Sequence, residues 1–536
     1  MPNQKIRTQP TKMESSTSKP FSRAEFLKEL EHAGKWDIII IGGGATGLGT
    51  ALDSASRGYK TLLLEQADFA KATSSRSTKL VHGGVRYLAQ GDIGLVYEAL
   101  HERGTLIGNA AHLVRAQAFV IPCYDWVSVM KYYAGLKLYD WLAGKLSFGQ
   151  SEYLSAEAVK QALPTIKPKG LKGGIRYYDG QFDDARLALN IAQTAAENGA
   201  TLLNYFKVTG LDKSNGKISG LKALDQETNK EYILSAKVVI NATGVFVDNI
   251  LQLDKSAARP IVRPSQGTHI VLDSSFLQGR TAMMVPKTSD GRVLFALPWQ
   301  DHVLLGTTDT PLDAHSLEPR ALQQEVDFIL DTAGQYLTRA PQRQDILSVF
   351  AGLRPLAAPV QDSGSTKEIS RSHKIIVSES GLLTITGGKW TTYRKMAEDT
   401  VNRAIKLGDL LYVPCTTKHL HILGGSSERA AIEGLIKNNI ELAARLSPHF
   451  SYQHADVIYA VRSEMARSIE DVLARRTRLL FLDAREALQA APIVAQLMAD
   501  ELEFDKAWQD AEVESFRALA SSYLNEQTIP EIEQTL

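Results

Sequence analysis

The chain of 536 residues contains only two cysteines, Cys123 and Cys415, which stand far apart and belong to no C-x-x-C pattern. This excludes a disulfide framework and a zinc ribbon, and it favours a reducing compartment. The sequence also lacks a run of about 18 consecutive apolar residues, so no segment is expected to span a bilayer. We predict no metal site.

An excess of charge of either sign is also missing, because 60 Lys and Arg residues balance 60 Asp and Glu residues. Proteins that bind nucleic acid through their overall charge are usually basic, so we expect no nucleic-acid partner. Internal repeats and low-complexity runs are absent as well. With 44% hydrophobic and 22% charged residues, the composition is that of a soluble globular protein, and the length predicts two or three domains.

A glycine-rich turn stands between a predicted strand and a predicted helix near the N-terminus. The predicted strand 37–41, with four consecutive isoleucines at 38–41, runs directly into Gly42, Gly44 and Gly47, which fill the three positions of G-x-G-x-x-G, and a helix is expected over about 45–57. The first glycine permits a tight turn, the second lets the backbone approach a pyrophosphate, and the third lets the helix pack on the strand. The N-terminus of that helix would attract the pyrophosphate.

A second strand, residues 61–65, ends in Glu65, at the distance where an acidic residue hydrogen-bonds a ribose hydroxyl. A glycine turn alone also serves plain packing of a helix on a strand. Here the strand, the helix and the acidic residue agree, so the sequence predicts a dinucleotide-binding unit.

Later segments predict a sheet assembled from pieces that are distant in the sequence. Residues 236–244 form a strand-like run that ends in Ala-Thr-Gly, while 184–198 and 200–205 are typical of a helix and a further short strand. Between 263 and 308, apolar runs punctuated by turn residues such as Asp290-Gly291 indicate an antiparallel meander. Such a meander favours a substrate domain that faces the cofactor domain, with the active site between them.

The last part of the chain has a helical pattern. Val461, Met465, Ile469 and Leu473 recur at four-residue spacing, which predicts a helix. The role of the nearby Arg475, Arg476 and Arg478 stays open at this point, since they could contact carboxylates of the substrate domain, a partner chain or only water.

Two further segments have the composition of cofactor contacts. Hydroxyl side chains crowd residues 73–77, and the pair Gly83-Gly84 would let the chain pass under a planar ring before Arg86 and Tyr87. Residues 383–396 again form a strand, a glycine turn and a helix, and a helix beginning near Thr391 and Thr392 would place partial positive charge beside a reduced flavin. Taken alone, each segment is equally compatible with a structural glycine turn.

Together these motifs resemble, over nearly the whole chain, the FAD-dependent glycerol-3-phosphate dehydrogenases of the bacterial aerobic and mitochondrial type. The matching segments are Ile41-Gly-Gly-Gly-Ala-Thr-Gly-Leu-Gly49, Ala72-Thr-Ser-Ser, His82-Gly-Gly-Val-Arg-Tyr-Leu88, Asp183-Asp-Ala-Arg-Leu187, Asn241-Ala-Thr-Gly244, Gly267-Thr-His-Ile-Val271, Gly306-Thr-Thr-Asp309, Ala351-Gly-Leu-Arg-Pro-Leu356, Gly387-Gly-Lys-Trp-Thr-Thr-Tyr-Arg394, Val461-Arg-Ser-Glu-Met-Ala466 and Asp471-Val-Leu-Ala-Arg-Arg-Thr-Arg-Leu479. The resemblance implies oxidation of sn-glycerol 3-phosphate to dihydroxyacetone phosphate by hydride transfer to flavin N5, with membrane quinone as the final acceptor.

The expected fold class is α/β with α+β insertions. We predict, in chain order, a disordered tail at 1–20, a discontinuous Rossmann-like FAD-binding domain at 21–100, 170–262 and 376–408, an antiparallel-sheet substrate domain at 101–169 and 263–375, and a C-terminal helical domain at 409–536. The expected FAD contacts are Gly42, Gly44, Ala45, Thr46, Gly47, Glu65, Thr73, Ser74, Ser75, Ser77, Lys79, Leu80, His82, Gly83, Gly84, Val208, Ala242, Thr243, Gly244, Gly388, Lys389, Thr391 and Thr392. Covalent attachment of FAD is not indicated.

The substrate site requires cationic and hydrogen-bonding groups, because a phosphate monoester carries about two negative charges and three acceptor oxygens. The resemblance implies Arg354 and Arg371 as phosphate ligands, Arg86 and Tyr87 beside the flavin, and Lys389 near the reacting carbon. Without the resemblance, each arginine would be interpreted as part of an ion pair.

Oxidation of an alcohol also requires a base for the hydroxyl proton, and His82 and His269 are the candidates. We prefer His82, because it precedes the glycine pair.

Transfer of electrons to quinone requires contact with a membrane surface. Residues 124–147 combine aromatic, aliphatic and lysine side chains on a predicted helix, which is typical of an interfacial anchor. A core helix under the substrate domain is the alternative, since Asp125 and Asp140 nearly cancel the lysines. We expect a cytoplasmic protein bound peripherally to the inner face of the membrane, and a homodimer is left open.

Three other functions compete. A glycerol-3-phosphate oxidase would pass electrons to oxygen and release peroxide, but it would carry an inserted segment that we do not find. An amine or amino-acid oxidase would bind a carboxylate with fewer cationic groups and would leave the helical tail unexplained. A non-catalytic flavin-binding scaffold would use the helical tail to dock a partner.

Overall fold

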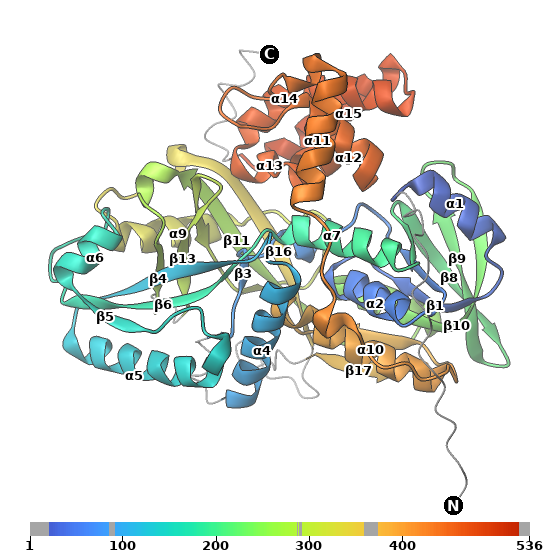
Figure 1. Cartoon of the computed structure of the whole chain (residues 1–536), viewed down its shortest axis with the longest axis horizontal. Coiled ribbons are helices and arrows are strands. Elements are labelled where there is room, and N and C mark those ends of the chain that lie inside the picture. Colours follow the sequence, from blue (N-terminus) through green and yellow to red (C-terminus); the bar gives the residue numbers. More distant parts are fainter. Residues whose placement is uncertain (1–20, 85–91, 287, 289–291, 358–372, 525–536) are drawn as a thin grey trace, which may run out of the picture.

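The computed structural model describes residues 21–84, 92–286, 288, 292–357 and 373–524. Two sheets lie side by side, and a group of C-terminal helices covers them at the top of Figure 1. The mixed α/β architecture and the C-terminal helical region confirm the predicted fold class.

The smaller, eight-stranded sheet has the order β17-β18-β10-β1-β2-β7, and β8 and β9 extend it beside β10. Its strands are β1 Trp36–Ile41, β2 Thr61–Leu64, β7 Thr201–Leu203, β8 Phe206–Ser214, β9 Lys217–Asp225, β10 Glu231–Asn241, β17 Lys374–Val377 and β18 Leu383–Thr386. β1, β2, β7, β10 and β18 pair in parallel, as the separated strand-like runs predicted.

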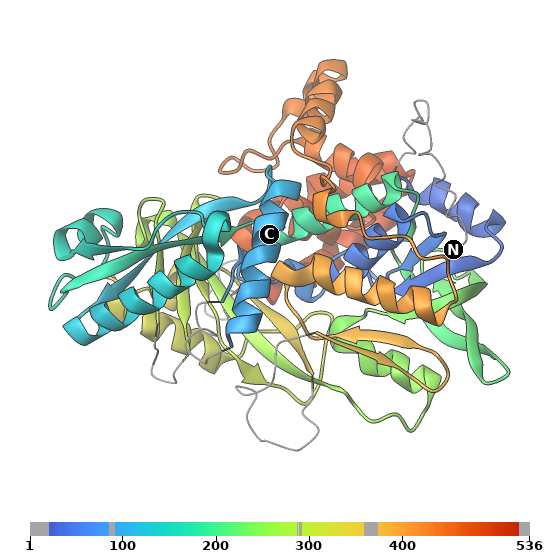
Figure 2. The same cartoon turned by 60° about the horizontal axis from the view of Figure 1, so that its bottom comes forward.

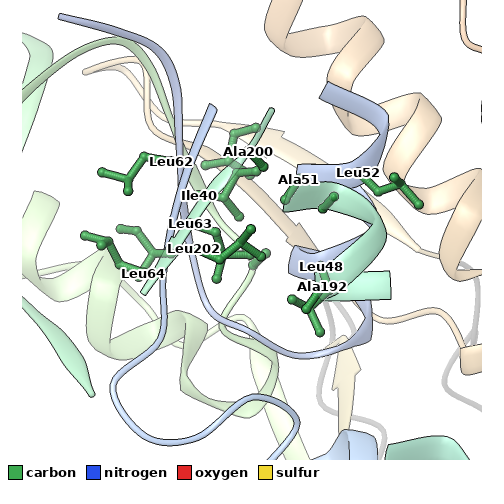
Figure 3. Packing of buried hydrophobic residues seen from close by; sticks show 14 of the residues in the cluster. Ile40, Leu48, Ala51, Leu52, Leu62, Leu63, Leu64, Ala192, Ala200 and Leu202 are labelled. Atoms are coloured by element: carbon green, nitrogen blue, oxygen red, sulfur yellow. The ribbon is translucent and has the colours of Figure 1, made fainter. Parts of the chain in front are cut away.

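Helix α2 (Ala45–Ser56) packs against α7 (Asp184–Glu197) and α10 (Tyr393–Leu407) over this sheet. Figure 3 shows Leu48, Ala51 and Leu52 of α2 beside buried leucines of the strands. Nearly continuous apolar runs such as Ile38–Ile41 are what a parallel sheet with covered faces requires. Helix α1 (Arg23–His32) precedes the sheet, and α8 (Val247–Asp254) follows β10.

The larger, ten-stranded sheet has the order β15-β11-β14-β13-β12-β4-β6-β3, with β16 beside β11 and β5 beside β6. Its strands are β3 Leu80–Val81, β4 Arg115–Cys123, β5 Glu152–Ser155, β6 Gly173–Gln181, β11 Val262–Asp273, β12 Ala282–Val285, β13 Leu294–Trp299, β14 His302–Gly306, β15 Thr310–Pro311 and β16 Ile346–Ala357. The meander predicted between 263 and 308 is confirmed, because β12, β13, β14 and β11 pair antiparallel in that order. The predicted turn at Asp290-Gly291 lies outside the described residues.

The chain crosses between the two sheets more often than the predicted domain boundaries imply. β3 and β6 lie within the segments 21–100 and 170–262 that we expected to form the FAD-binding domain, yet both pair in the larger sheet. β3 leads directly to His82, and α7 begins three residues after β6 ends. The segments that contain β3 and β6 therefore contribute to the larger sheet and also continue into parts of the chain that pack with the smaller sheet.

Helices α4 (Ile93–Asn109), α5 (Trp126–Ala143), α6 (Ala156–Ala162) and α9 (Gln323–Tyr336) accompany the larger sheet. α5 buries Leu136 and Tyr139 on one side, while Trp126 and Trp141 are exposed on the other. The predicted helix is confirmed, and it packs on the larger sheet with one side while the other side is exposed. Across the described ranges, no helix combines the length and the apolar character needed to cross a membrane.

The C-terminal helices are α11 Ser426–Asn438, α12 His454–Glu464, α13 Leu479–Leu482, α14 Ala484–Leu502 and α15 Lys506–Ser521. The single helix predicted from Val461 to Leu473 is wrong, because α12 ends at Glu464 and Met465 adopts a left-handed conformation with φ 56°. After this break the chain becomes helical again at the π-helical turn Asp471–Arg476. Ile469 and Leu473 nevertheless are buried in one apolar cluster with side chains of the larger sheet.

The three arginines of this region contact carboxylates of the FAD-binding segments. Arg475 and Arg476 both pair with the buried Asp68, and Arg478 lies 3.1 Å from Asp184. Buried ion pairs of this kind require close partners, since an isolated buried charge would be strongly destabilising. The irregular turn between α12 and α13 thus contacts the FAD-binding segments, as do Glu428 of α11 and Glu464 of α12, which both pair with Arg186.

Candidate active site

A cavity of about 470 Å³ lies at the carboxyl ends of the parallel strands β1, β10 and β18. In an open α/β sheet, this is where a nucleotide ligand binds. Thirteen predicted FAD contacts line it: Gly42, Gly44, Ala45, Thr46, Glu65, Thr73, Ser74, Val208, Ala242, Thr243, Gly244, Gly388 and Lys389. Phe206, Asn249 and Leu317 line it too but belong to no motif from which the sequence could have identified them. Pro355 and Trp390 also line it, and the segments that they share with the family were the available signal for them.

The glycines of the turn have no room for a side chain. A Cβ at Gly42, where φ is +110°, would lie 2.8 Å from the carbonyl oxygen of Ala242, and a Cβ at Gly47 would lie 1.8 Å from that of Gly42. At Gly44 it would approach Ser74 Oγ at 3.0 Å, on the wall of the cavity. Gly44 is also the N-cap residue of α2, so the positive end of the helix dipole faces the cavity. A polar, backbone-lined cradle of this kind suits a pyrophosphate.

Glu65 lies at the end of β2, buried at the cavity wall. Its carboxylate accepts hydrogen bonds from the N–H groups of Gly43 (2.6 Å) and Ala67 (2.9 Å). Burial raises the pKa of Glu65 above its usual value, although these two bonds oppose the rise. Each carboxylate oxygen has a second lone pair that can accept a ribose hydroxyl.

Only the first two residues of the segment 73–79, Thr73 and Ser74, line the cavity. Ser74 Oγ accepts from the N–H of Ala45 at 2.9 Å, which fixes the segment to the start of α2. Ser77 and Lys79 instead turn to the buried Asp184, at 2.7 and 2.8 Å. Ser75, Ser77 and Lys79 are therefore not brought to the wall of the cavity. Burial and the nearby Arg478 lower the pKa of Lys79 to about 7, against the attraction of Asp184.

A second cavity, of about 190 Å³, lies in the larger sheet beside β3, β6, β13 and β16. The predicted residues His82, Leu80, Gly84 and Arg354 line it. Its other polar wall residues, which the sequence did not identify, are Thr78, Asp179, Arg292, Thr307, Thr308 and Asp309. Thr307 to Asp309 lie in a segment shared with the family, which was the available signal for them. Asp179 and Arg292 lie in no such segment, so the sequence carried no signal for them.

Arg354 is held in place by its own neighbours at this cavity. Its Nη2 donates to Thr307 Oγ1 (3.1 Å) and to the carbonyl oxygen of Thr308 (2.9 Å), and Nη1 lies 3.2 Å from Asp309. The side chain is 23% exposed. A guanidinium is a planar group of donors whose geometry matches phosphate oxygens, and here Thr307, Thr308 and Asp309 fix its orientation at the cavity wall.

A hydrogen bond links the turn at His82, on the wall of the smaller cavity, to the turn that follows Lys389, on the wall of the larger cavity. The N–H of His82 donates to Thr391 Oγ1 at 3.1 Å, and Thr391 belongs to the short 3-10 turn Trp390–Thr392 that begins beside Lys389. Thr392 is the N-cap residue of α10, as the predicted helix start implied. Lys389 and Trp390 line the larger cavity, whereas His82 lines the smaller one.

The second histidine, His269, does not line either cavity. It is 2% exposed, stacks on Phe350 and has its Nε2 2.9 Å from Thr78 Oγ1. Burial, with Lys79 and Arg354 nearby, holds the pKa of His269 well below its usual value, so the ring is neutral. The predicted site residues Arg86, Tyr87 and Arg371 lie outside the described residues.

The comparisons with known proteins agree with this geometry. The family model described as FAD dependent oxidoreductase matches residues 37–394, and the one described as C-terminal domain of alpha-glycerophosphate oxidase matches 429–509. The mitochondrial glycerol-3-phosphate dehydrogenase of Schizosaccharomyces pombe is 38% identical, over 96% of this chain and 91% of its own. The chain belongs to the FAD-dependent glycerol-3-phosphate dehydrogenases.

Other members and solved structures extend the similarity. The mitochondrial glycerol-3-phosphate dehydrogenase of Rattus norvegicus is 40% identical over 92% of this chain and 74% of its own. The solved glycerol-3-phosphate dehydrogenase from Bacillus halodurans, complexed with FAD, superposes with a TM-score of 0.75 at 29% identity and covers 94% of this chain and 98% of its own. An L-alpha-glycerophosphate oxidase from Mycoplasma pneumoniae shares the fold (TM-score 0.55, 17% identity, 73% of this chain and 99% of its own).

These findings confirm the predicted family, the FAD cofactor and an oxidoreductase activity. The alternative of a non-catalytic scaffold is therefore wrong. The likeness to the Mycoplasma oxidase, at 17% identity, concerns the fold alone.

Proposed function

We propose that this enzyme oxidises sn-glycerol 3-phosphate to dihydroxyacetone phosphate and passes the electrons to membrane quinone. The observation that carries the proposal is a pair of cavities whose walls are linked by the hydrogen bond between His82 and Thr391. One has the glycine cradle of a dinucleotide site, and the other presents a fixed arginine fork beside a histidine. Membership of the family supports the same substrate.

FAD fits the larger cavity. The start of α2 at Gly44 and Ala45 would hold the pyrophosphate, Glu65 a ribose hydroxyl, and the turn at Gly388 and Lys389 the flavin end, where the N-terminus of α10 adds partial positive charge. The remaining predicted wall residues complete the proposed cofactor site. When bound, FAD supplies a two-electron acceptor that takes hydride at flavin N5.

The smaller cavity would take the substrate. Arg354 would bind the phosphate, with Arg86, Tyr87 and Arg371 as further contacts that the family resemblance implies. Lys389 would lie near the reacting carbon. His82 would accept the proton of the hydroxyl while the carbon loses its hydride, so that alcohol becomes ketone. His269, neutral and away from the cavity walls, would orient Thr78 rather than serve as the base.

Anaerobic titration tests this function. Glycerol 3-phosphate should bleach the yellow flavin rapidly, glycerol only very slowly and amino acids not at all, because neither of these offers a phosphate to Arg354. Reoxidation with a quinone should then be fast and peroxide formation in air slow. Fast reoxidation by oxygen would instead identify an oxidase, and bleaching by an amino acid would identify an amino-acid oxidase.

The outward face of α5 is the proposed membrane contact. Trp126 (57%), Val127 (77%), Met130 (74%) and Trp141 (75%) are exposed there, while Leu136 on the opposite side is buried. Large exposed apolar side chains on one helix mark an interaction site, and aromatic residues with lysines suit a lipid interface. Lys131 and Lys137 lie on the same helix. Figures 1 and 2 show α5 on the outside of the larger sheet.

The double variant Trp126→Gln, Trp141→Gln should bind vesicles of anionic and neutral phospholipid about 30- to 1,000-fold more weakly. Each indole removed from an interface costs about 1–2 kcal/mol at partial insertion. Sedimentation measures the binding, and reduction of a water-soluble dye should stay at the wild-type rate. Ile440→Gln is the control, because Ile440 is 76% exposed in the C-terminal domain. Unchanged sedimentation of the double variant would reject this surface.

A further inference from the structure

The turn that carries His82 is held from two sides. On one side His82 donates its N–H to Thr391, and on the other the N–H of Gly83 donates to the phenolic oxygen of Tyr139 at 2.9 Å. Tyr139 belongs to α5 and is 2% exposed. A Cβ at Gly83 would lie 2.6 Å from that oxygen, so the close approach requires glycine.

The hydroxyl of Tyr139 has a fixed direction. It donates to Asp179 Oδ2 at 2.8 Å, while Arg103 Nη1 donates to Oδ1 at 2.7 Å. Burial and the charge of Asp179 raise the pKa of Tyr139 well above its usual value, so the phenol keeps its proton. Because a phenol has one proton and gives it to Asp179, a lone pair faces the N–H of Gly83. The four groups therefore form a chain of hydrogen bonds with one possible polarity.

Asp179 lines the smaller cavity, where a carboxylate would repel an anionic substrate. Arg103 offsets that charge from behind. Its guanidinium is buried and packs 4.4 Å from the centroid of the Phe148 ring. Both carboxylate oxygens of Asp179 accept hydrogen bonds from the protein. Oδ2 accepts from Tyr139, and Oδ1 accepts from Arg103 and from the N–H of Gly180 at 3.2 Å. Asp179 is thus arranged to hold Tyr139 rather than to bind substrate.

We propose that Tyr139 is a positioning residue of the reaction. Its hydroxyl, held by Asp179 and Arg103, fixes the backbone of Gly83 and thereby the direction in which His82 faces the smaller cavity. The inference rests on the proposed function, in which His82 accepts the substrate proton. It assigns α5 a second role, because the buried side of the helix with the exposed tryptophans supports the site.

The test is Tyr139→Phe, which keeps the ring and removes only the hydroxyl. Flavin reduction at saturating glycerol 3-phosphate should slow about 10- to 100-fold, the cost of a small misplacement of a reacting group. FAD content and KM should stay at wild-type values. The melting temperature should fall no further than in Tyr205→Phe, because each variant removes one hydroxyl from a buried carboxylate. The pH dependence of the rate should shift because the base is displaced. Tyr205→Phe is the matched control, since the half-buried Tyr205 also donates its hydroxyl to a buried carboxylate, that of Asp471 at 2.8 Å. Its rate and pH profile should be those of the wild type.

Three outcomes overturn the inference. Wild-type rate and pH profile in Tyr139→Phe would show that the hydroxyl does not position His82. Loss of FAD or of thermal stability in step with the rate would assign Tyr139 a general structural role, and a raised KM at unchanged rate would assign it to substrate binding. If glycerol 3-phosphate fails to bleach the wild-type flavin, the proposed function itself fails, and this is visible before any variant is made.

Discussion

Replacement of His82 by alanine should slow anaerobic flavin reduction by glycerol 3-phosphate about 10²- to 10⁴-fold, the range that a positioned general base contributes. His82 lines the smaller cavity, and its backbone is bonded to Thr391 beside the flavin end of the larger one. Its side chain can therefore reach the substrate hydroxyl without being needed to hold the cofactor. FAD content should stay near the wild-type value.

The pH dependence gives an independent readout of this prediction. A base works only when it is unprotonated, so the wild-type rate should rise with pH as the imidazole loses its proton, and His82→Ala should lose that rise. His421→Ala serves as the control, because His421 is exposed and lines neither cavity. If His82→Ala reduces its flavin at the wild-type rate, His82 is not the base. Loss of FAD together with the rate would place it in the cofactor site instead.

The second large effect is expected for Arg354→Lys, with kcat/KM for glycerol 3-phosphate falling about 30- to 1,000-fold. Arg354 is oriented by Thr307, Thr308 and Asp309, so its fork is fixed before the substrate arrives. Lysine keeps the charge but provides a single ammonium centre, which cannot bind two phosphate oxygens and leaves these oriented partners unmatched. Loss of a charge-assisted pair costs about 2–4 kcal/mol, and each 1.4 kcal/mol is about tenfold in kcat/KM.

Glycerol distinguishes phosphate binding from structural damage. Glycerol has no phosphate to lose, so wild type and Arg354→Lys should oxidise it at similarly low rates. Arg176→Lys is the matched control, because Arg176 forms a half-exposed ion pair with Glu152 at 2.7 Å on the larger sheet. Equal impairment of Arg354→Lys on both substrates would mean that Arg354 supports the fold or the flavin.

Prediction from sequence succeeded where the constraint is local. The clash of a Cβ at Gly47 with the carbonyl of Gly42 arises within six residues of chain. The need for glycine at position 47 can therefore be predicted from the motif alone. The antiparallel meander was equally accessible, because its hairpins join neighbouring segments. By contrast, the four-residue apolar spacing from Val461 to Leu473 predicted one helix. The helix ends at Met465, and the arginines that follow pair with carboxylates far away in the sequence, Asp68 and Asp184, which the spacing does not record.

The sequence by itself determined the dinucleotide cradle, the family and thirteen of the residues that line the larger cavity, since glycine positions and turn chemistry depend on the backbone nearby. Only the tertiary structure decided which polar residues reach the cavities. Lys79 lies in the predicted cofactor segment but turns to the buried Asp184, because an ammonium group deprived of water needs a carboxylate. Asp179 carried no motif, yet strand pairing brings it to the smaller cavity, where Arg103 from α4 and Tyr139 from α5 meet it. Contacts between residues so distant in the chain follow from how the sheets and helices pack, and no local pattern records them.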